Sequence, residues 1–200
     1  MILVAGGSGQ VGKWLAEVGG AAVETFSSAE LDVTNAMTVR DFVGDLNPDW
    51  VVNCAAHTAV DAAEAEPERA HKINVAGAGN LARACAEMDS RLVHLSTDYV
   101  FGETAVLSEP LSEDHPCAPL SVYGRTKLAG EQAVRSVLPQ ATIVRTAWVY
   151  TGPSRSRLSL MGNDFVTTML ALEKTRDFVT VVNGPFRIQS ALIRSRSCPE

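Results

Sequence analysis

A tyrosine and a lysine four residues apart have the types and the spacing to do chemistry in this 200-residue sequence. Tyr123 and Lys127, in the stretch SVYGRTK, would share one face of a helix. A phenol is a poor acid at neutral pH, and a nearby ammonium lowers its pKa by favouring the phenolate. Tyr123 could therefore protonate the alkoxide that hydride transfer to a ketone leaves, with Lys127 tuning it. The spacing alone leaves a chance surface pair open.

Hydroxyl and carboxyl groups follow a short apolar run that is expected to be a strand. The run 91–95 continues as Ser96, Thr97 and Asp98. Ligands of α/β sheets lie beyond the carboxyl ends of the strands, and a hydroxyl placed there can polarise a carbonyl by hydrogen bonding. Thr97 is therefore predicted to steady the oxygen that Tyr123 protonates. A turn or capping role for Ser96 and Asp98 is the alternative.

Three glycines stand three residues apart at the start of the chain. Gly6, Gly9 and Gly12 follow an apolar run and open a segment of helical pattern. Glycine permits a tight turn and lets a phosphate approach the backbone, and a helix N-terminus attracts a pyrophosphate. The context of strand before and helix after predicts a dinucleotide site.

The nicotinamide cofactor is expected to be NADPH or NADH, and the sequence leaves the choice open. The residues after Phe26 are Ser27 and Ser28, so the end of the second strand has no carboxylate for a ribose 2′-hydroxyl and no arginine for a 2′-phosphate. Asp32, a few residues further along the chain, is the candidate carboxylate, and a turn role explains it equally well.

The elements that position these residues alternate between short apolar runs and longer helical patterns, which is the signature of a βαβ fold. We expect strands at 2–5, 22–26, 50–55, 91–95, 142–146 and 179–182, and helices at 10–17, 36–46, 67–88, 120–138 and 164–173. This order predicts an α/β fold with a doubly wound parallel sheet, Rossmann-like. A dinucleotide-binding domain is predicted over 1–183, followed by a divergent tail over 184–200.

Composition favours an ordinary globular protein, with 46% apolar and 20% charged residues. The formal charge of -6 argues against nucleic-acid or anionic-membrane partners. Four cysteines without a C-x-x-C pattern suggest reduced thiols and no metal site. The sequence shows neither a basic leader nor an apolar stretch as long as a membrane span, so we expect a cytoplasmic protein.

Several stretches together resemble the dTDP-4-dehydrorhamnose reductases, a branch of the extended short-chain dehydrogenase/reductase family. They are GGSGQVG, VVNCAAHTAVDAAEAEPERAHKINVAGAGNLA, HLSTDYVF, PLSVYGRTKLAGEQAV, IVRTAWVYTG and NDFVTTML. The resemblance implies reduction of the 4-keto group of dTDP-4-dehydro-L-rhamnose by NADPH or NADH, giving dTDP-L-rhamnose for cell-wall polysaccharide. It leaves open whether the chain forms a homodimer.

The resemblance also implies roles for individual residues. It makes Tyr123 the proton donor, Lys127 the residue that contacts the cofactor ribose and tunes the tyrosine, and Thr97 the hydroxyl beside the carbonyl. It gives substrate contacts to Thr97, Asp98 and Trp148. It gives cofactor contacts to Tyr123 and Lys127 and to Gly6, Gly9, Gln10, Val11, Gly12, Asp32, Val33, Ala56, His57 and Thr58.

The resemblance ends at Val182. The family pattern continues with Asp-Gln-x-Gly-x-Pro-Thr and a C-terminal lobe that completes the sugar-nucleotide pocket, whereas this chain reads NGPFRIQS from Asn183. We therefore expect the lobe to be largely missing, through truncation or a frameshift, and the activity to be weak or absent. The alternative is a non-catalytic dinucleotide-binding protein that resembles the regulatory subunit of methionine adenosyltransferase.

Overall fold

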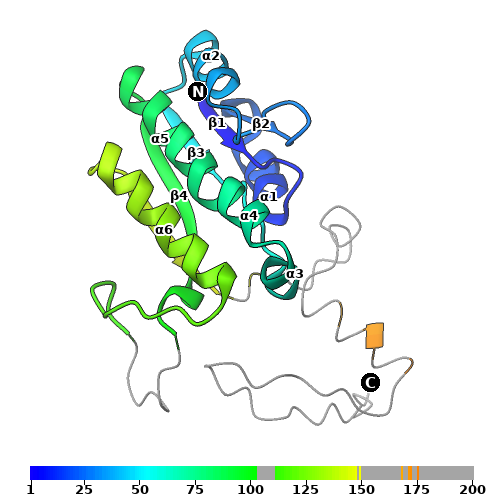
Figure 1. The fold of residues 1–200 in the computed structure, drawn as a ribbon. Coiled ribbons are helices and arrows are strands. Elements are labelled where there is room, and N and C mark those ends of the chain that lie inside the picture. Colours follow the sequence, from blue (N-terminus) through cyan, green and yellow to red (C-terminus); the bar gives the residue numbers. More distant parts are fainter. Residues whose placement is uncertain (103–110, 148, 150–167, 169–170, 173–174, 176–200) are drawn as a thin grey trace. The chain divides into compact units, whose positions relative to one another are not determined.

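Five parallel strands form one sheet in the part of the chain that the structure describes (Figure 1). The structure is a computed structural model and describes residues 1–102, 111–147, 149, 168, 171–172 and 175. The strands lie in the order β2-β1-β3-β4-β5. Their bounds are β1 (Ile2–Ala5), β2 (Val23–Phe26), β3 (Trp50–Asn53), β4 (Arg91–Thr97) and β5 (Thr142–Thr146). The chain moves outward from β1 to β2 and then crosses back to β3, so a ligand-binding switch point lies between β1 and β3.

The strands are short apolar runs because parallel strands are covered on both faces. Leu3, Val4 and Val51 are fully buried. The register pairs Ala5 with Asn53 across β1 and β3. It pairs Asn53 with His94 across β3 and β4. The carboxyl ends of the strands therefore lie on the same side of the sheet, and β4 extends beyond β3 as far as Thr97.

Helices fill the connections between the strands. The α-helices are α1 (Gln10–Gly19), α2 (Ala36–Leu46), α3 (Val60–Ala65), α4 (Pro67–His71), α5 (Ala78–Glu87) and α6 (Val122–Val137). The single turns η1 (Gly20–Ala22) and η3 (Asp98–Val100) are 3₁₀ helices, and η2 (Lys72–Gly77) is a π-helix. α5 packs against α2 on one side and α6 on the other, while α1 packs against β1 and β2. Right-handed crossovers place α1 on one face of the sheet and α2, α5 and α6 on the opposite face.

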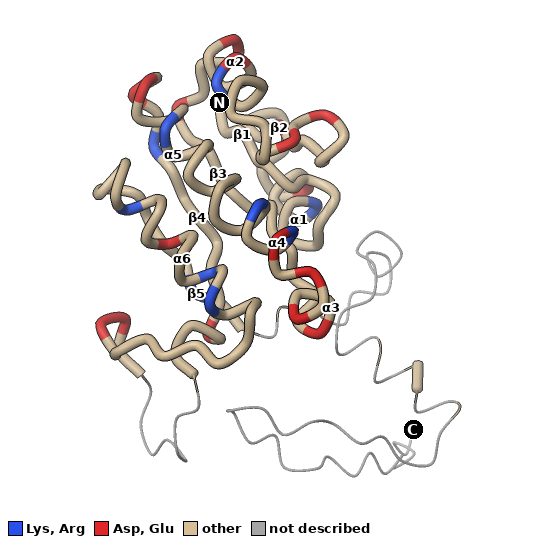
Figure 2. Tube along the Cα trace, in the orientation of Figure 1, with Lys and Arg blue, Asp and Glu red and all other residues tan. Residues whose placement is uncertain are grey.

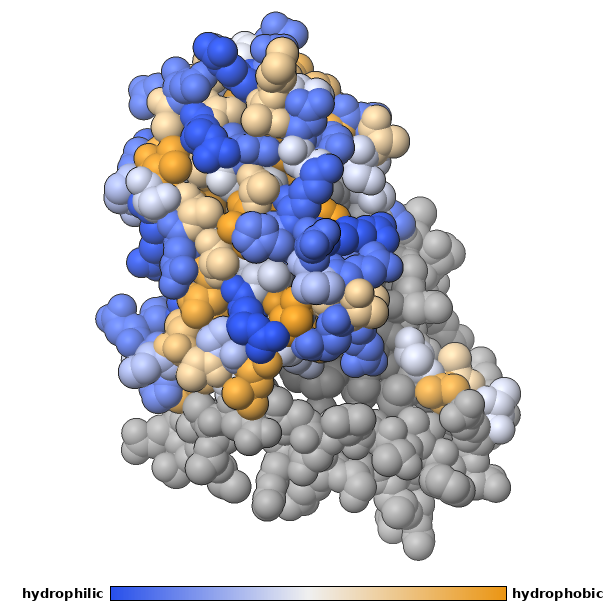
Figure 3. All heavy atoms as spheres, in the orientation of Figure 1, coloured by the Kyte–Doolittle hydropathy of each residue, from blue (hydrophilic) through white to orange (hydrophobic). Residues whose placement is uncertain are grey.

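The core lies between the sheet and these helices. It gathers buried side chains from β1, α2, α5 and β4, among them Leu3, Val43, Leu81 and Leu92. Hydrophilic residues cover most of the face shown in Figure 3, and hydrophobic ones appear there in small groups. None of the helices in the described ranges is long and apolar enough to cross a membrane.

The sequence predicted most of these elements within two residues. The helix expected over 67–88 is interrupted by the π-turn η2, and α3 was not expected. The strand predicted over 179–182, most of the helix over 164–173 and the tail over 184–200 lie outside the described residues.

Contacts divide the chain into two units, one of residues 1–102 and 116–147 and the other of 103–115 and 148–200. The sheet and all the elements named above belong to the first unit. The predicted domain boundary at 183 lies outside the described residues and stays a prediction.

Candidate active site

The glycine turn joins β1 to α1 at the switch point of the sheet. Gly6 has a φ of +83°, and a Cβ on it would lie 2.6 Å from the backbone nitrogen of Ala55. A Cβ on Gly12 would lie 2.7 Å from the carbonyl oxygen of Gly6. Both glycines are therefore required for α1 to begin this close to the strand ends, which directs the helix N-terminus at the turn.

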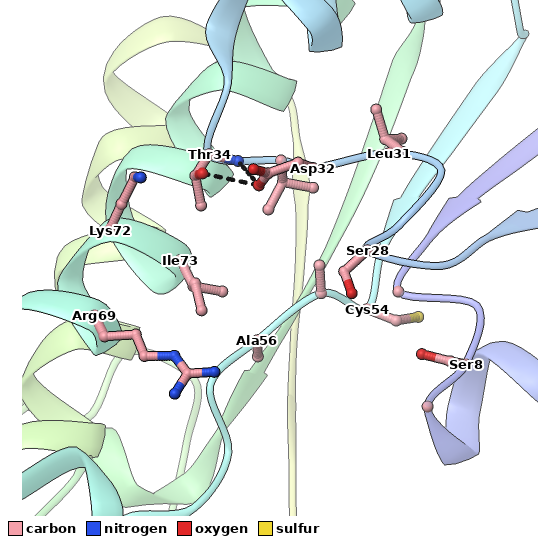
Figure 4. Close-up of a pocket in the computed structure, with 14 residues that line it drawn as sticks. Ser8, Ser28, Leu31, Asp32, Thr34, Cys54, Ala56, Arg69, Lys72 and Ile73 are labelled. Atoms are coloured by element: carbon pink, nitrogen blue, oxygen red, sulfur yellow. Dashed lines mark hydrogen bonds between the residues drawn. The ribbon is translucent and has the colours of Figure 1, made fainter. Parts of the chain in front are cut away.

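A pocket of about 440 Å³ opens directly beside this turn. Its walls come from the glycine turn, the segment after β2, the segment after β3 and the helix pair α4–η2 (Figure 4). The lining residues are Gly6, Ser8, Gly9, Ser28, Leu31, Asp32, Val33, Thr34, Cys54, Ala55, Ala56, Arg69, Lys72 and Ile73. The pocket therefore lies where a dinucleotide binds in a doubly wound fold.

Two cationic side chains line the wall opposite the glycine turn. Arg69 of α4 and Lys72 of η2 lie across the pocket from Ser8 and Ser28 in Figure 4. Neither cation was predicted from the sequence, because a cation for the cofactor was expected next to Ser27 and Ser28 along the chain. Their spacing of three residues on one helical stretch was the available signal.

Asp32 has a turn role and also lines the pocket. Its Oδ1 accepts hydrogen bonds from the backbone nitrogen of Thr34 at 2.9 Å and from the Thr34 hydroxyl at 2.8 Å. These bonds hold the pKa of Asp32 below its usual value. The two interpretations of this residue are thus compatible, because the turn holds the ionised carboxylate at the pocket wall.

The segment that follows β3 is held in place by one buried asparagine. Asn74 of η2 accepts a hydrogen bond from the His57 backbone nitrogen at 2.8 Å and donates to the His57 carbonyl and to the Thr126 hydroxyl of α6. Asn74 therefore ties the pocket wall to the helix that carries Tyr123. No role was predicted for Asn74 from the sequence.

Thr97 and Tyr123 meet at the end of β4. A hydrogen bond links their side chains, and the Thr97 hydroxyl also donates to Oδ1 of Asp98 at 3.1 Å. The same Thr97 oxygen accepts from the backbone nitrogen of Tyr99 and so caps η3, a role that was expected only for Ser96 and Asp98. The ring of Tyr99 packs edge-on against that of Tyr123, with centroids 5.5 Å apart.

The pKa of Tyr123 moves in the direction opposite to the one expected. Burial raises it, the hydrogen bond with Thr97 lowers it, and the nearby Asp98 and Tyr99 raise it further. Sequence spacing shows the lysine but gives no measure of burial, so it predicted only the lowering effect. The phenol therefore keeps its proton at neutral pH.

Lys127 lies buried behind the pocket wall. Its Nζ donates a hydrogen bond to the carbonyl of Leu95 on β4 at 2.6 Å. Burial lowers its pKa to about 8, while the carboxylate of Glu131, and Cys54 where its thiol is ionised, raise it. Because Cys54 lines the pocket, the ammonium stands close to the ligand-binding space.

The predicted cofactor residues divide into two groups. Those that line the pocket are Gly6, Gly9, Asp32, Val33 and Ala56. Those outside its lining are Gln10, Val11, Gly12, His57, Thr58, Tyr123 and Lys127, of which Gly12 and His57 support its walls through the contacts above. Trp148 lies outside the described residues.

Several known proteins of similar sequence are named dTDP-4-dehydrorhamnose reductase. A dTDP-4-dehydrorhamnose reductase of Mycolicibacterium smegmatis is 47% identical over 184 residues, which are 90% of this chain and 53% of the relative. The protein of the same name from Salmonella typhimurium is 42% identical over 92% of this chain and 60% of its own length. The chain thus spans between half and two thirds of the length of these curated relatives.

Solved structures agree with the sequence comparison. A dTDP-4-dehydrorhamnose reductase of Clostridium acetobutylicum superposes with a TM-score of 0.78 at 41% identity, over 89% of this chain and 61% of that one. The Bacillus anthracis protein of that name, in complex with NADP, gives 0.79 at 38% identity with the same coverage. The model of the RmlD substrate binding domain matches residues 1–188. With that match over nearly the whole sequence, the chain belongs to the RmlD substrate binding domain family.

Proposed function

We propose that this chain binds NADPH or NADH and reduces the 4-keto group of dTDP-4-dehydro-L-rhamnose to give dTDP-L-rhamnose. The observation that carries the proposal is that the side chains of Thr97 and Tyr123 meet at the end of β4, at the same edge of the sheet as the glycine turn. The names of the similar proteins support the substrate. The complex of the Bacillus anthracis protein with NADP supports the cofactor.

The pocket beside the glycine turn fits a dinucleotide in shape and charge. The N-terminus of α1 favours a pyrophosphate, and Arg69 and Lys72 face the turn across the pocket. Bound there, the reduced nicotinamide supplies the hydride for the substrate carbon. The chain itself then has to position the carbonyl, donate one proton and keep water from the site.

Tyr123 donates that proton in the proposed reaction. Its raised pKa keeps the phenol protonated until the substrate oxygen becomes an alkoxide, which is a stronger base. The Thr97 hydroxyl hydrogen-bonds the same oxygen, and Lys127 places a positive charge behind the pocket that favours the phenolate once the proton has left. Hydride and proton together convert the ketone to the alcohol.

Retention of Thr97, Tyr123 and Lys127 in one site favours the enzyme over the alternative of a regulatory subunit, and nothing in the described residues favours the latter. A homodimer and a cytoplasmic location stay predictions.

The proposal is tested by titrating the protein with NADPH and with NADH, and then by adding the 4-keto sugar nucleotide and following the nicotinamide absorbance. Tyr123→Phe removes the proton donor and keeps the ring. We expect it to lower kcat by roughly 10² to 10⁴ and to leave dinucleotide affinity within a few-fold of the parent value.

Three results would contradict the proposal or a part of it. Absence of dinucleotide binding contradicts it entirely. Dinucleotide binding without any turnover, at high protein concentration and long reaction times, contradicts the reductase activity of this chain. Equal turnover by Tyr123→Phe and the parent protein removes the role given to the phenol.

A further inference from the structure

A buried ionic cluster lies behind the residues of the proposed site. Glu131 of α6 is 2% exposed, and its carboxylate accepts Arg145 in a two-pronged ion pair, with Nε at 3.0 Å and Nη2 at 2.7 Å. The Ser96 hydroxyl donates to Oε1 of the same carboxylate. The guanidinium of Arg145 also lies over the ring of Phe101, 4.9 Å from its centroid.

The cluster joins the elements that carry the proposed machinery. Ser96 directly precedes Thr97 on β4, Arg145 is on the neighbouring strand β5, and Glu131 follows Lys127 by one helical turn. A two-pronged arginine pair fixes the orientation of a carboxylate. Any displacement of Glu131 would therefore move the strand end that holds the Thr97 hydroxyl.

Glu131 is also the anionic group that acts on Lys127 among the described residues. Burial raises the pKa of the Cys54 thiol to about 11, so the thiol is neutral at pH 7. Burial and the Lys127 charge lower the pKa of His94 to about 3, so the imidazole of that β4 residue is neutral as well. Of the two groups whose charge would raise the pKa of Lys127, Glu131 is therefore the one that is ionised at pH 7.

We propose that Glu131 is a positioning residue of this site, which holds Ser96 beside Thr97 and supplies the negative charge that keeps the buried Lys127 as an ammonium. The inference rests on the proposed function only for the use that catalysis makes of that charge. The contacts of the carboxylate stand independently of it.

A purely structural role for the Glu131–Arg145 pair makes a different prediction. Buried ion pairs often contribute little net stability, because desolvation offsets their attraction. If the pair only filled space in the core, removing its charge would alter the stability of the protein and leave the titration of Lys127 in place. The titration of Lys127 therefore separates the two roles.

The experiment follows the four lysines by carbon NMR after labelling of their side-chain ε-carbons, with pH varied from neutral to alkaline. The signal lost in Lys127→Arg identifies Lys127. In Glu131→Gln, which keeps the shape and the hydrogen-bond acceptor but not the charge, we expect Lys127 to titrate about one unit lower than in the parent protein. Glu131→Asp keeps the charge and should restore most of the parent value.

Glu87→Gln is the matched control. Glu87 forms an ion pair with Arg40 between two exposed side chains on α5 and α2, so its removal changes the total charge of the protein by the same amount. It lies outside the proposed machinery, and we expect Lys127 to titrate as in the parent protein. A shift as large as that in Glu131→Gln would overturn the inference.

Glu131→Gln removes the carboxylate of the ion pair with Arg145, and loss of one partner of a largely buried pair is strongly destabilising. If that variant does not fold, the double variant Glu131→Gln, Arg145→Met removes both charges. The methionine then packs an apolar side chain over the ring of Phe101. The downward shift of Lys127 is expected there too. A folded variant in which Lys127 titrates at the parent pH overturns the inference, as does an equal shift in Glu131→Asp and Glu131→Gln.

The titration uses neither substrate nor cofactor, so its outcome is independent of the proposed function. Absence of turnover by the parent protein contradicts the reductase activity while the NMR result still decides the role of Glu131. Where turnover is present, we expect the pH–rate profile of Glu131→Gln to move in the same direction as the Lys127 signal.

Discussion

The Lys127 ammonium is buried in the protein, with the residue only 2% exposed. Its pKa falls to about 8 chiefly through burial, whereas an exposed lysine titrates near 10.4. The native state therefore binds the proton of Lys127 less tightly than the unfolded state does. Below pH 8 both states are protonated and the native state carries the full cost, which vanishes as pH rises above the unfolded pKa.

Lys127→Met is expected to stabilise the fold and to weaken the site. At pH 7 the gain in free energy of unfolding should be about 1 to 3 kcal/mol, because the lost bond to the Leu95 carbonyl offsets part of the relief. The gain should shrink between pH 8 and 10.5. Denaturant unfolding at several pH values measures it.

Turnover and dinucleotide affinity of Lys127→Met should both fall. A variant that is less stable than the parent at every pH would show that the ammonium is better solvated than its burial indicates.

The tyrosine and lysine of the site were predictable from the sequence, because a spacing of four residues fixes a shared face on any helix. Their surroundings were not. Burial of Tyr123 and Lys127 depends on how β4 and the segment after β3 pack around α6, and these segments are separated by up to about seventy residues along the chain. The direction of the Tyr123 pKa was missed for that reason.

At the scale of elements, the stretch 67–87 joins three consecutive helical segments of two forms, α and π. α4 passes into the π-turn η2 and then into α5. Turns of π-helix inside longer helices are frequent at functional sites. Here the turn contains Asn74, whose amide bridges the pocket wall and α6, and Lys72, which faces the pocket.

Asn74→Ala should loosen the pocket wall without unfolding the sheet. Removing the amide leaves the backbone nitrogen and carbonyl of His57 without their partner, at a cost of about 2 to 4 kcal/mol. Amide hydrogen exchange over 54–59 should become faster than in the parent, while exchange in β1 and β3 stays slow.

Asn74→Asp is the matched comparison for this change. It keeps the acceptor for the His57 nitrogen and loses the two donations, so its effect should be intermediate. Exchange that increases equally across the whole sheet would contradict a local role for this residue.

Helix and strand positions followed from the apolar pattern, since α2 and β5 begin and end where the sequence predicts. The π-turn could not be predicted, because its residues keep the same helical periodicity as their neighbours. The role of Asn74 was also hidden, since its partners lie 17 and 52 residues away.

At the scale of the whole molecule, a chain of net charge -6 carries its proposed anion site on a cationic wall. Acidic residues gather instead at α3 (Figure 2). The positive charges of Arg69 and Lys72 thus oppose, at this pocket, the net negative charge of the protein, which would repel an anionic ligand.

The double variant Arg69→Gln, Lys72→Gln should weaken dinucleotide binding by about tenfold, and the loss should be smaller at high salt because exposed charges are screened. Isothermal titration at two salt concentrations measures it. Arg40→Gln removes a cation of α2 outside the pocket and should bind as the parent does. Equal affinity of the double variant and the parent would place the phosphates elsewhere.

The strand order has a consequence for synthesis on the ribosome. Both neighbours of β1 are made by residue 53, so the strands on either side of the glycine turn are complete when about a quarter of the chain has been translated. β4 and β5 then add outward in the order in which they emerge. Among these five described strands, each new strand pairs at an edge of the sheet already formed. None has to be inserted between two strands made earlier.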